Sequence, residues 1–503
     1  MSNPLYETLF GRHAGKTTPF LHLENGTSLS HADFLARAAQ LAHAMVSLGV
    51  RPGDRVAAQI DKSPDALALY AACAQAGLVF LPLNTGYTAD EVSYFVENSG
   101  AALFVCQDHR RAEMSVLAKS AGAFLETLDQ DQGGSLAKRA DRQPADFDTV
   151  DRDGDDLAAF LYTSGTTGRS KGTMLTQNNL LSNAQALAEL WQFTAQDVLL
   201  HALPIFHTHG LFVAVNVTLA AGGSMIFLPK FDLDFLLENM HRATAMMGVP
   251  TFYTRLLEDP RFTRDRTRDM RVFISGSAPL LAETHVQFEE RTGHRILERY
   301  GMTETNMNTS NPYDGERRAG TVGFPLPGVE LKITDPATGD TLADGEIGQI
   351  EVRGPNVFKG YWGMPDKTAA ELRENGFFIT GDLGRIDDDG YVSIVGRDKD
   401  MIISGGYNIY PKEIELLIDD QPGVLESAVI GVPHPDFGEA VLGIVVAKPS
   451  ANPEPDQILR NISTSLARFK QPRALIFVRE LPRNTMGKVQ KNLLRKEYEN
   501  YAQ

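Results

Sequence analysis

Short apolar runs alternate with helical patterns along most of this 503-residue chain. One helical pattern follows the N-cap candidate Ser30, places Phe34, Leu41 and Met45 on one face, and stops at Gly49. Apolar runs bounded by Gly, Pro or Asp predict buried strands, and helices between such strands predict parallel, doubly wound α/β sheets. The runs are 79–83, 102–106, 157–162, 225–228 and 272–274.

The pattern changes at about residue 346. Segments 347–352 and 391–395 alternate apolar and polar residues between Gly- and Asp-rich turns, which predicts antiparallel strands. The C-terminal region adds helical patterns and further strand-like runs, which is enough for a small α+β domain. A charged run at 397–400 follows Gly396 and marks the boundary. We therefore predict one domain at 1–397 and a second at 398–503.

Composition excludes several classes of protein. A formal charge of −16 argues against a nucleic-acid partner, which needs a basic face. Cys73 and Cys106 lie in apolar surroundings, which argues against a disulfide framework and fits a reducing cytoplasm. The N-terminus lacks the pattern of a secretion signal, and no apolar run reaches the roughly 18 residues of a membrane span. We expect a cytoplasmic protein without a membrane segment.

A glycine- and hydroxyl-rich loop at 162–172 follows one of the predicted strands. Its glycines let the backbone approach a polyanion, its hydroxyls can donate hydrogen bonds, and Lys171 adds a positive charge. It lacks the Walker A pattern, and the alternative interpretation is a surface turn. The residues predicted to bind phosphate are Thr163, Ser164, Gly165, Thr166, Thr167, Gly168 and Lys171.

Lys488 closes the segment Pro-Arg-Asn-Thr-Met-Gly-Lys at 482–488, near the C-terminus. A lysine on a glycine turn carries little information alone. In a chain that also holds a phosphate-type loop far upstream, it suggests that an end domain brings a positive charge to a remote active site.

Five separated motifs occur in a characteristic order: the loop, Tyr-Gly-Met-Thr-Glu at 300–304, Thr-Gly-Asp at 380–382, the run 396–400 with Gly-Gly-Tyr-Asn at 405–408, and the Lys488 segment. Together they resemble the ANL superfamily of adenylate-forming enzymes, over nearly the whole chain. This resemblance implies a large N-terminal domain of parallel sheets plus a small distorted β-barrel, and a small mobile C-terminal domain.

The resemblance also implies a reaction in two halves. A carboxylate attacks the α-phosphate of ATP to give an acyl-adenylate and pyrophosphate, and the thiol of coenzyme A then displaces AMP. Glu304, with Thr163, would hold Mg²⁺, an ion that prefers oxygen ligands and bridges phosphates. Thr303 would donate to the α-phosphate, Lys488 would bridge the acyl carboxylate and the phosphate, and His207 would line the junction of acid and phosphate.

Further residues would bind the nucleotide. Tyr300 would stack on adenine, and Asp382, assisted by Arg397, would accept from the ribose hydroxyls; the alternative for Asp382 is an ordinary turn residue. The remaining residues assigned to ATP and AMP are Ser277, Ala278, Pro279, Glu298, Arg299, Gly301 and Met302.

For the second half-reaction, the resemblance implies a rotation of the C-terminal domain about Lys399, which would bring Gly405, Gly406 and Tyr407 against a tunnel for the pantetheine arm. The alternative for Lys399 is a solvated surface charge. The resemblance also makes Lys488 a target for a lysine acetyltransferase and a deacetylase, because acetylation deletes its charge.

Two arginines suggest which acid is used. Arg299 and Arg255, near Ser277 and His207, would place guanidinium groups in an otherwise apolar pocket, which is costly unless the substrate supplies an anion. A second substrate carboxylate, bound bidentately, meets that need. The strings 206–211, 298–305 and 482–488 resemble malonyl-CoA synthetases. The alternative is that either arginine pairs with a local acid such as Glu298 or Glu258.

Other functions stay open. Methylmalonate differs from malonate by one methyl group, which a pocket discriminates weakly, and another short acid is a further alternative. Adenylation for a carrier protein is disfavoured because no carrier domain is appended. A non-catalytic AMP sensor would be expected to have lost Lys488 or Glu304. The His207–His209 pair lacks the further ligands of a zinc site.

Overall fold

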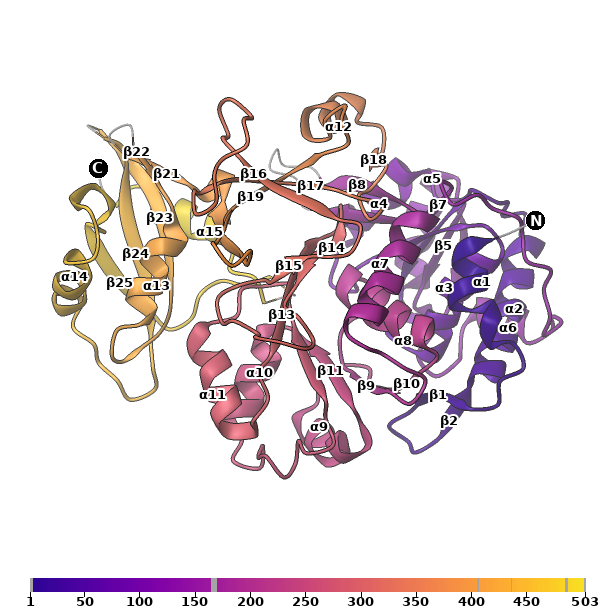
Figure 1. The fold of residues 1–503 in the computed structure, drawn as a ribbon. Helices are drawn as coiled ribbons and strands as arrows, with labels where there is room; N and C mark the ends of the chain where they lie inside the picture. Colours follow the sequence, from indigo (N-terminus) through magenta and orange to yellow (C-terminus); the bar gives the residue numbers. More distant parts are fainter. Residues whose placement is uncertain (1–2, 164–169, 405–406, 436, 485–486, 502–503) are drawn as a thin grey trace. The chain divides into compact units, whose positions relative to one another are not determined.

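The computed structural model describes residues 3–163, 170–404, 407–435, 437–484 and 487–501 (Figure 1). The chain divides into two compact units. Unit 1 comprises Met1–Glu330 and Val352–Phe378, and unit 2 comprises Leu331–Glu351 and Ile379–Gln503. The division predicted at 397/398 from the charged run 397–400 differs from this partition, and it stays a prediction.

A nine-stranded sheet forms one half of unit 1. Its central strands are parallel, while β14 and β15 at one edge and β2 at the other are antiparallel to their neighbours. In spatial order the strands are β15 (Phe324–Pro325), β14 (Asn306–Ser310), β13 (Leu297–Met302), β12 (Val272–Ser275), β11 (Ala245–Gly248), β9 (Val198–His201), β10 (Ser224–Phe227), β1 (Pro19–His22) and β2 (Ser28–Ser30).

A seven-stranded sheet forms the other half. Strands β3 to β7 pair in parallel, and β8 and β18 add antiparallel strands at one edge. The order is β18 (Gly360–Tyr361), β8 (Lys171–Thr176), β7 (Leu157–Thr163), β4 (Val79–Pro82), β3 (Arg55–Gln59), β5 (Leu103–Cys106) and β6 (Phe124–Thr127). All five predicted strand runs are strands, so the predicted α/β class is confirmed.

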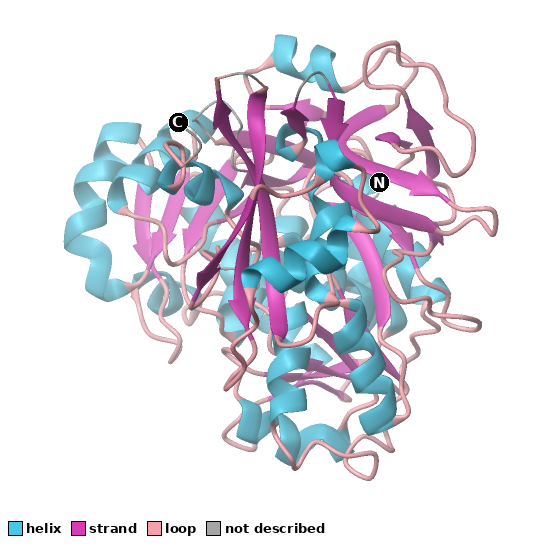
Figure 2. Ribbon diagram, turned by 90° about the vertical axis from the view of Figure 1, so that its left-hand side faces the viewer, coloured by secondary structure: helices cyan, strands magenta, loops and turns pink. Residues whose placement is uncertain are grey.

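Helices pack on these sheets in the alternation that the sequence predicts (Figure 2). The helix predicted after Ser30 is present, with a capping box between Ser30 and Asp33 that satisfies its first backbone donors. The helices of unit 1 are α1 (Pro4–Leu9), α2 (His31–Ser47), α3 (Pro64–Gln75), α4 (Ala89–Ser99), α5 (Arg111–Ala121), α6 (Ser135–Ala140), α7 (Gln177–Leu190), α8 (Asn216–Ala221), α9 (Leu233–Asn239), α10 (Pro250–Glu258), α11 (Ala282–Thr292) and α12 (Pro365–Glu371).

Helix α7 contacts strands of both sheets of unit 1. Its Asn183 side chain exchanges two hydrogen bonds with the backbone of Met307 in β14, at 2.8 and 3.2 Å. Asn179, one turn earlier, donates to the carbonyls of Pro355 and Val357, both at 2.8 Å. Buried side-chain amides therefore fix the β13–β14 hairpin and the segment that precedes β18 to one helix, which positions the candidate site described below.

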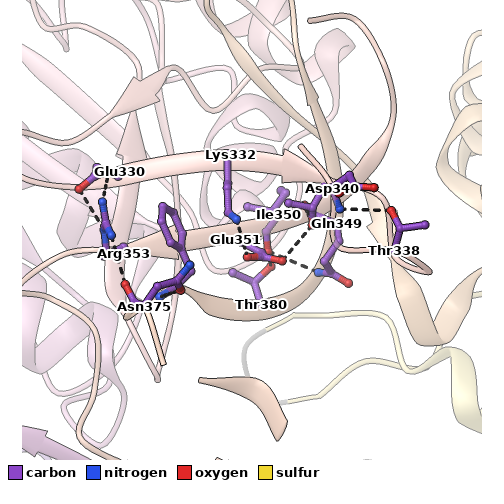
Figure 3. A network of polar contacts seen from close by, with 12 residues as sticks. Glu330, Lys332, Thr338, Asp340, Gln349, Ile350, Glu351, Arg353, Asn375 and Thr380 are labelled. Atoms are coloured by element: carbon purple, nitrogen blue, oxygen red, sulfur yellow. Dashed lines mark hydrogen bonds and ion pairs between the residues drawn. The ribbon is translucent and has the colours of Figure 1, made fainter. Parts of the chain in front are cut away.

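The region expected as a small barrel is a four-stranded sheet in the order β16 (Glu330–Thr334), β17 (Gly348–Arg353), β19 (Phe378–Ile386) and β20 (Val392–Arg397). Figure 3 shows the polar contacts that cross it. The Glu351 carboxylate is fully buried, but it pairs with Lys332 at 3.2 Å and accepts from the Thr334 hydroxyl at 3.0 Å. These partners offset the desolvation cost of the charge.

The C-terminal part of unit 2 contains a five-stranded sheet with helices packed on it. Two apolar clusters line it, one of them built around Val429, Val445 and Ile414. This is the small α+β arrangement that the sequence predicts. Its elements are β21 (Ile402–Ser404), β22 (Tyr407–Ile409), β23 (Val424–His434), β24 (Gly438–Ala447), β25 (Ala474–Val478), α13 (Pro411–Asp419), α14 (Pro455–Ser463) and α15 (Lys491–Glu497).

Candidate active site

The predicted phosphate loop joins two neighbouring antiparallel strands. β7 ends at Thr163, which pairs with Lys171 at the start of β8. Gly172 is required there, because a methyl group at this position would come within 2.2 Å of the Phe160 ring. The predicted ligands Ser164, Gly165, Thr166, Thr167 and Gly168 lie outside the described residues.

Glu304 lies in the turn between β13 and β14 and is 5% exposed. Its Oε1 atom accepts from the Thr163 hydroxyl at 3.4 Å and from the Tyr361 hydroxyl at 3.1 Å. The structure therefore brings Glu304 and Thr163 together, as predicted for a magnesium site, and a carboxylate beside a hydroxyl is a donor set that suits Mg²⁺. Among the described residues no group of three or more acidic, His or Cys side chains could hold a metal.

Tyr361, Glu371 and Lys171 form a polar network beside Glu304. The Tyr361 hydroxyl lies 2.7 Å from Glu371 Oε2 and 3.1 Å from Lys171 Nζ. Burial opposes ionisation of Glu371, but Lys367, Tyr361 and Lys171 hold the pKa of this carboxyl below its ordinary value. Sequence reasoning missed Tyr361 and Glu371, because only folding brings β18 and α12 beside Lys171 at the start of β8.

Arg299 projects from β13 into the interior and is 4% exposed. Its guanidinium lies against the backbone of Gly276, where a methyl group would come within 2.3 Å of Arg299 Cζ. Its Nε and Nη2 have no hydrogen-bond partner among the described residues. Burial lowers the pKa of Arg299 to about 9, which still leaves the group positively charged near neutral pH. The site contains a buried cation with two donor atoms that the described part of the chain leaves unused.

His209 lies near this cation, and His207 lies near His209. His209 begins a π-helical segment at 209–215, a rare conformation that recurs at functional sites, and its Nδ1 lies 3.1 Å from the Ser277 hydroxyl. Ser277 has a φ of 74°, a left-handed conformation that is unusual for a serine. The Nε2 atoms of His207 and His209 lack partners among the described residues. Burial lowers the pKa of His207 to about 4, so the ring is neutral at pH 7.

The other predicted nucleotide residues of unit 1 either follow the carboxyl end of β12 or lie in and directly after its parallel neighbour β13. This edge of an α/β sheet is the usual place for a ligand. Gly301 permits the close approach of β13 and β14, since a methyl group there would come within 1.9 Å of the Asn306 carbonyl oxygen. The residues that this edge brings together are Ser277, Ala278, Pro279, Glu298, Arg299, Tyr300, Gly301, Met302 and Thr303.

Arg255 does not join this group. It lies in the last turn of α10, is exposed, and places its guanidinium 5.6 Å from the centre of the Phe231 ring. The structure records no ion pair between Arg255 and Glu258 among the described residues. We therefore assign the buried charge of the candidate site to Arg299.

Unit 2 carries its own set of predicted residues. Asp382 in β19 is 4% exposed and pairs with Arg397 of β20, with Arg397 Nε 2.8 Å from Asp382 Oδ1. Lys488 is half-buried near both. Burial and the neighbouring Arg397 charge lower the pKa of Lys488 to about 8, against the opposing effect of Asp382. Lys488, which loses its proton more readily than an ordinary lysine, thus interacts electrostatically with Asp382 and Arg397, the predicted ribose-binding pair.

Local hydrogen bonds and an ion pair stabilise the turn that carries Lys488. Asn484 Oδ1 accepts from the Lys488 backbone N–H at 2.9 Å, and Arg483 donates to the Gly487 carbonyl at 2.5 Å. Arg483 also forms an ion pair with Glu426 of β23. These contacts order the backbone around Lys488.

Of the predicted coenzyme A and pivot residues, Tyr407 and Lys399 are described, and both lie on the surface. Tyr407 is exposed and stacks on Phe469, with the ring centres 4.5 Å apart, while Gly405 and Gly406 lie outside the described residues. Lys399 is exposed in a short 3-10 turn at 398–400. This placement agrees with a pivot and with a solvated surface charge alike.

Comparison with known proteins identifies the family. Residues 10–362 match the model of the AMP-binding enzyme family, and residues 413–488 match the model of the AMP-binding enzyme C-terminal domain. The chain belongs to the AMP-binding enzyme family. It is therefore one of the adenylate-forming acyl-CoA ligases, which use ATP and coenzyme A.

This AMP-binding enzyme is similar to several named proteins. It is 56% identical to MatB from Rhodopseudomonas palustris, whose ATP-bound crystal structure covers 100% of both chains with a TM-score of 0.98. A malonate–CoA ligase from Arabidopsis thaliana is 37% identical, over 84% of this chain and 74% of the relative. A feruloyl-CoA synthase from Amycolatopsis is 36% identical, over 94% of each chain. Because two curated relatives with different acids are almost equally similar, the residues of the site must decide the acid.

None of the helices among the described residues of this AMP-binding enzyme combines the length and apolar content needed to cross a bilayer.

Proposed function

We propose that this AMP-binding enzyme is a malonate–CoA ligase that converts malonate, ATP and coenzyme A into malonyl-CoA, AMP and pyrophosphate through malonyl-AMP. The observation that carries the proposal is Arg299, a buried guanidinium with two donors unused among the described residues. Leaving a charge buried and uncompensated costs several kcal/mol. A substrate that brings its own second carboxylate removes this cost, whereas a monocarboxylic acid does not.

The chemistry around Arg299 suits a small diacid. The guanidinium can bind one carboxylate with two parallel N–H···O bonds. Neutral His207 and His209 each present an Nε2 that is unpaired among the described residues, and they add no competing charge. The other carboxylate of malonate would be the nucleophile. We place it toward the Thr303–Glu304 turn, because the same strand, β13, leads from Arg299 to that turn.

The first half-reaction develops negative charge around the α-phosphate, so catalysis depends mainly on positioning and charge neutralisation. Glu304 and Thr163 would hold Mg²⁺, which when bound neutralises phosphate charge. Thr303 would donate to the α-phosphate, and Tyr300 would stack on adenine. Asp382 would accept from the ribose hydroxyls, in an orientation fixed by its pair with Arg397.

Lys488 would supply a positive charge to the attacking carboxylate and the phosphate. In the second half-reaction a rotation about Lys399 would withdraw this charge and present Tyr407 to the pantetheine arm of coenzyme A. The relatives support the overall reaction, since a malonate–CoA ligase is among the curated relatives and the 56% identical MatB was crystallised with ATP.

Pyrophosphate release measured across malonate, methylmalonate, succinate, acetate and octanoate tests the proposal. We expect the highest kcat/KM with malonate, and malonyl-CoA as the product by mass spectrometry. Methylmalonate is the nearest competitor because one methyl group is worth only about 1–3 kcal/mol in a pocket. A preference for acetate or octanoate over every diacid would overturn the assignment of malonate and leave an acyl-CoA ligase for another acid.

A further inference from the structure

A short segment at 358–361 contacts Glu304 through both its backbone and a side chain. The Phe358 N–H donates to the Glu304 carbonyl oxygen at 2.8 Å, and the Tyr361 hydroxyl lies 3.1 Å from the Glu304 carboxylate. Tyr361 is 3% exposed, and its ring packs edge-on against Phe358, with the ring centres 4.8 Å apart. Packing of the ring therefore holds the Tyr361 side chain in place independently of the contacts of its hydroxyl.

The Tyr361 hydroxyl stands between two carboxylates. It lies 2.7 Å from Glu371 Oε2 and 3.1 Å from Glu304 Oε1, so a single phenolic proton serves two negative groups. Two lysines supply the compensating charge. Lys171 lies 3.1 Å from the hydroxyl and 3.5 Å from Glu371, and Lys367 pairs with Glu371 at 2.7 Å. Without the two lysines, the Tyr361 hydroxyl oxygen would not be expected to lie so close to the carboxylate oxygens of both Glu304 and Glu371.

Among the described residues, two hydroxyl groups contact Glu304, and both contacts fall on the same atom. Thr163 and Tyr361 donate to Oε1 from opposite elements, the end of β7 and strand β18. Two donors on one oxygen restrict rotation of the carboxylate about its last bond. Thr163 and Tyr361 thus help to set the direction in which Glu304 presents its charge.

The same contacts change the interpretation of Lys171. The sequence suggested that its charge binds phosphate directly, but its ammonium group is bonded to Tyr361 and Glu371 and lies 4.2 Å from the centre of the Tyr361 ring. In this structure its charge stabilises the Tyr361–Glu371 pair.

We propose that Tyr361 is a positioning residue for Glu304, with its hydroxyl held by Lys171 and Glu371 so that the Glu304 carboxylate is oriented toward the metal–nucleotide complex. This inference rests on the metal-holding role of Glu304 in the proposed function. It does not depend on which acid the enzyme uses.

Tyr361→Phe in the full-length protein tests it, because phenylalanine keeps the ring packing and removes only the hydroxyl. The measurement is Mn²⁺ affinity, followed by electron paramagnetic resonance, in the presence of a non-hydrolysable ATP analogue. Loss of an outer partner of a metal ligand typically weakens metal binding by roughly 10- to 100-fold, and we expect a loss in this range. The melting temperature and the KM for the acid should change little.

A double-mutant cycle separates positioning from a general structural effect. In a Glu304→Gln background, adding Tyr361→Phe should weaken Mn²⁺ binding by less than about twofold, since the hydroxyl no longer has a carboxylate to orient. Tyr70→Phe is the matched control. It removes another buried tyrosine hydroxyl, one that contacts Asn216, and it should leave metal affinity unchanged.

Two results would overturn the inference: unchanged metal affinity in Tyr361→Phe, or the same loss with and without Glu304. If Glu304→Gln alone bound Mn²⁺ normally, the metal-holding role would also fall, while the assignment of the acid to Arg299 would stand. Should Tyr361→Phe fail to fold, Glu371→Gln on the half-buried face of α12 is the second variant. It should weaken metal binding in the same direction, and no weakening would count against the inference.

Discussion

The Arg299 guanidinium lies directly on the backbone of Gly276, so closely that a methyl group on Gly276 would come within 2.3 Å of Arg299 Cζ. The two residues come from neighbouring parallel strands, since Gly276 directly follows β12 and Arg299 lies in β13. The missing side chain at 276 is what gives the buried cation its position.

Gly276→Ala should therefore move the guanidinium without preventing folding, because the end of a side chain can shift more easily than backbone. Misplacing a charged hydrogen bond to the substrate should cost about 1–3 kcal/mol. This corresponds to a roughly 5- to 150-fold lower kcat/KM for malonate. Steady-state kinetics together with a melting curve would check this expectation. A variant with unchanged malonate kinetics would show that the position of Arg299 is not critical.

Lys488→Ala should block the first half-reaction and spare the second. We expect pyrophosphate release to fall roughly 100- to 1,000-fold, the usual effect of losing one donor to a developing negative charge. Thioester formation from supplied malonyl-AMP should remain close to that of the parent, because the rotation removes Lys488 from that step. Equal loss in both assays would argue against the alternation of domains.

The same lysine predicts a pH dependence. Its pKa is lowered to about 8, so the folded protein carries this charge below pH 8 and loses it as pH rises through that value. Thus kcat/KM for pyrophosphate release, which reports the free enzyme, should decline above about pH 8. The rate with supplied malonyl-AMP should not show this decline. For stability the sign is opposite: because the folded pKa lies below the ordinary value, this group makes the folded state more stable as pH rises from 8 toward 10.5.

Lys399→Pro should have the reverse effect of Lys488→Ala. Lys399 lies in a 3-10 turn, and the φ typical of such turns is close to the value that proline imposes. It should leave pyrophosphate release nearly intact and slow transfer to coenzyme A, because the fixed φ opposes rotation. Lys399→Ala is the control, and both half-reactions should survive in it. Normal thioester turnover in the proline variant would move the pivot elsewhere.

The sequence predicted the framework well because buried parallel strands leave a strong local signal. The runs at 79–83 and 272–274, for example, correspond to β4 and β12, and the cap at Ser30 starts α2. The sequence predicted that both Arg255 and Arg299 bind the substrate carboxylate, because a local pattern does not show where a side chain points. Only the fold shows that Arg299 points inward from a central strand while Arg255 ends a helix on an exposed face.

Tyr361 and Glu371 left no recognisable signal for a further physical reason. β18 comprises only Gly360–Tyr361, too short for a periodic pattern, and its pairing partner β8 lies far away in the sequence. Contacts of this kind depend on long-range closure of the sheet rather than on local propensity. Lys171 was recognised as a charge, but its bond to Tyr361 could not be foreseen.

The most direct test of the central claim is the ratio of kcat/KM for malonate to that for butyrate, compared between the parent, Arg299→Leu and the exposed control Arg255→Leu. Deleting one partner of a desolvated, charge-assisted contact costs about 2–5 kcal/mol. This corresponds to a roughly 30- to 5,000-fold loss with malonate in Arg299→Leu. Butyrate has no second charge and should lose little or gain, so the ratio should collapse in Arg299→Leu and stay at the parent value in Arg255→Leu. If Arg299→Leu kept the parent's preference for malonate over butyrate, the assignment of a diacid substrate to this site would be wrong.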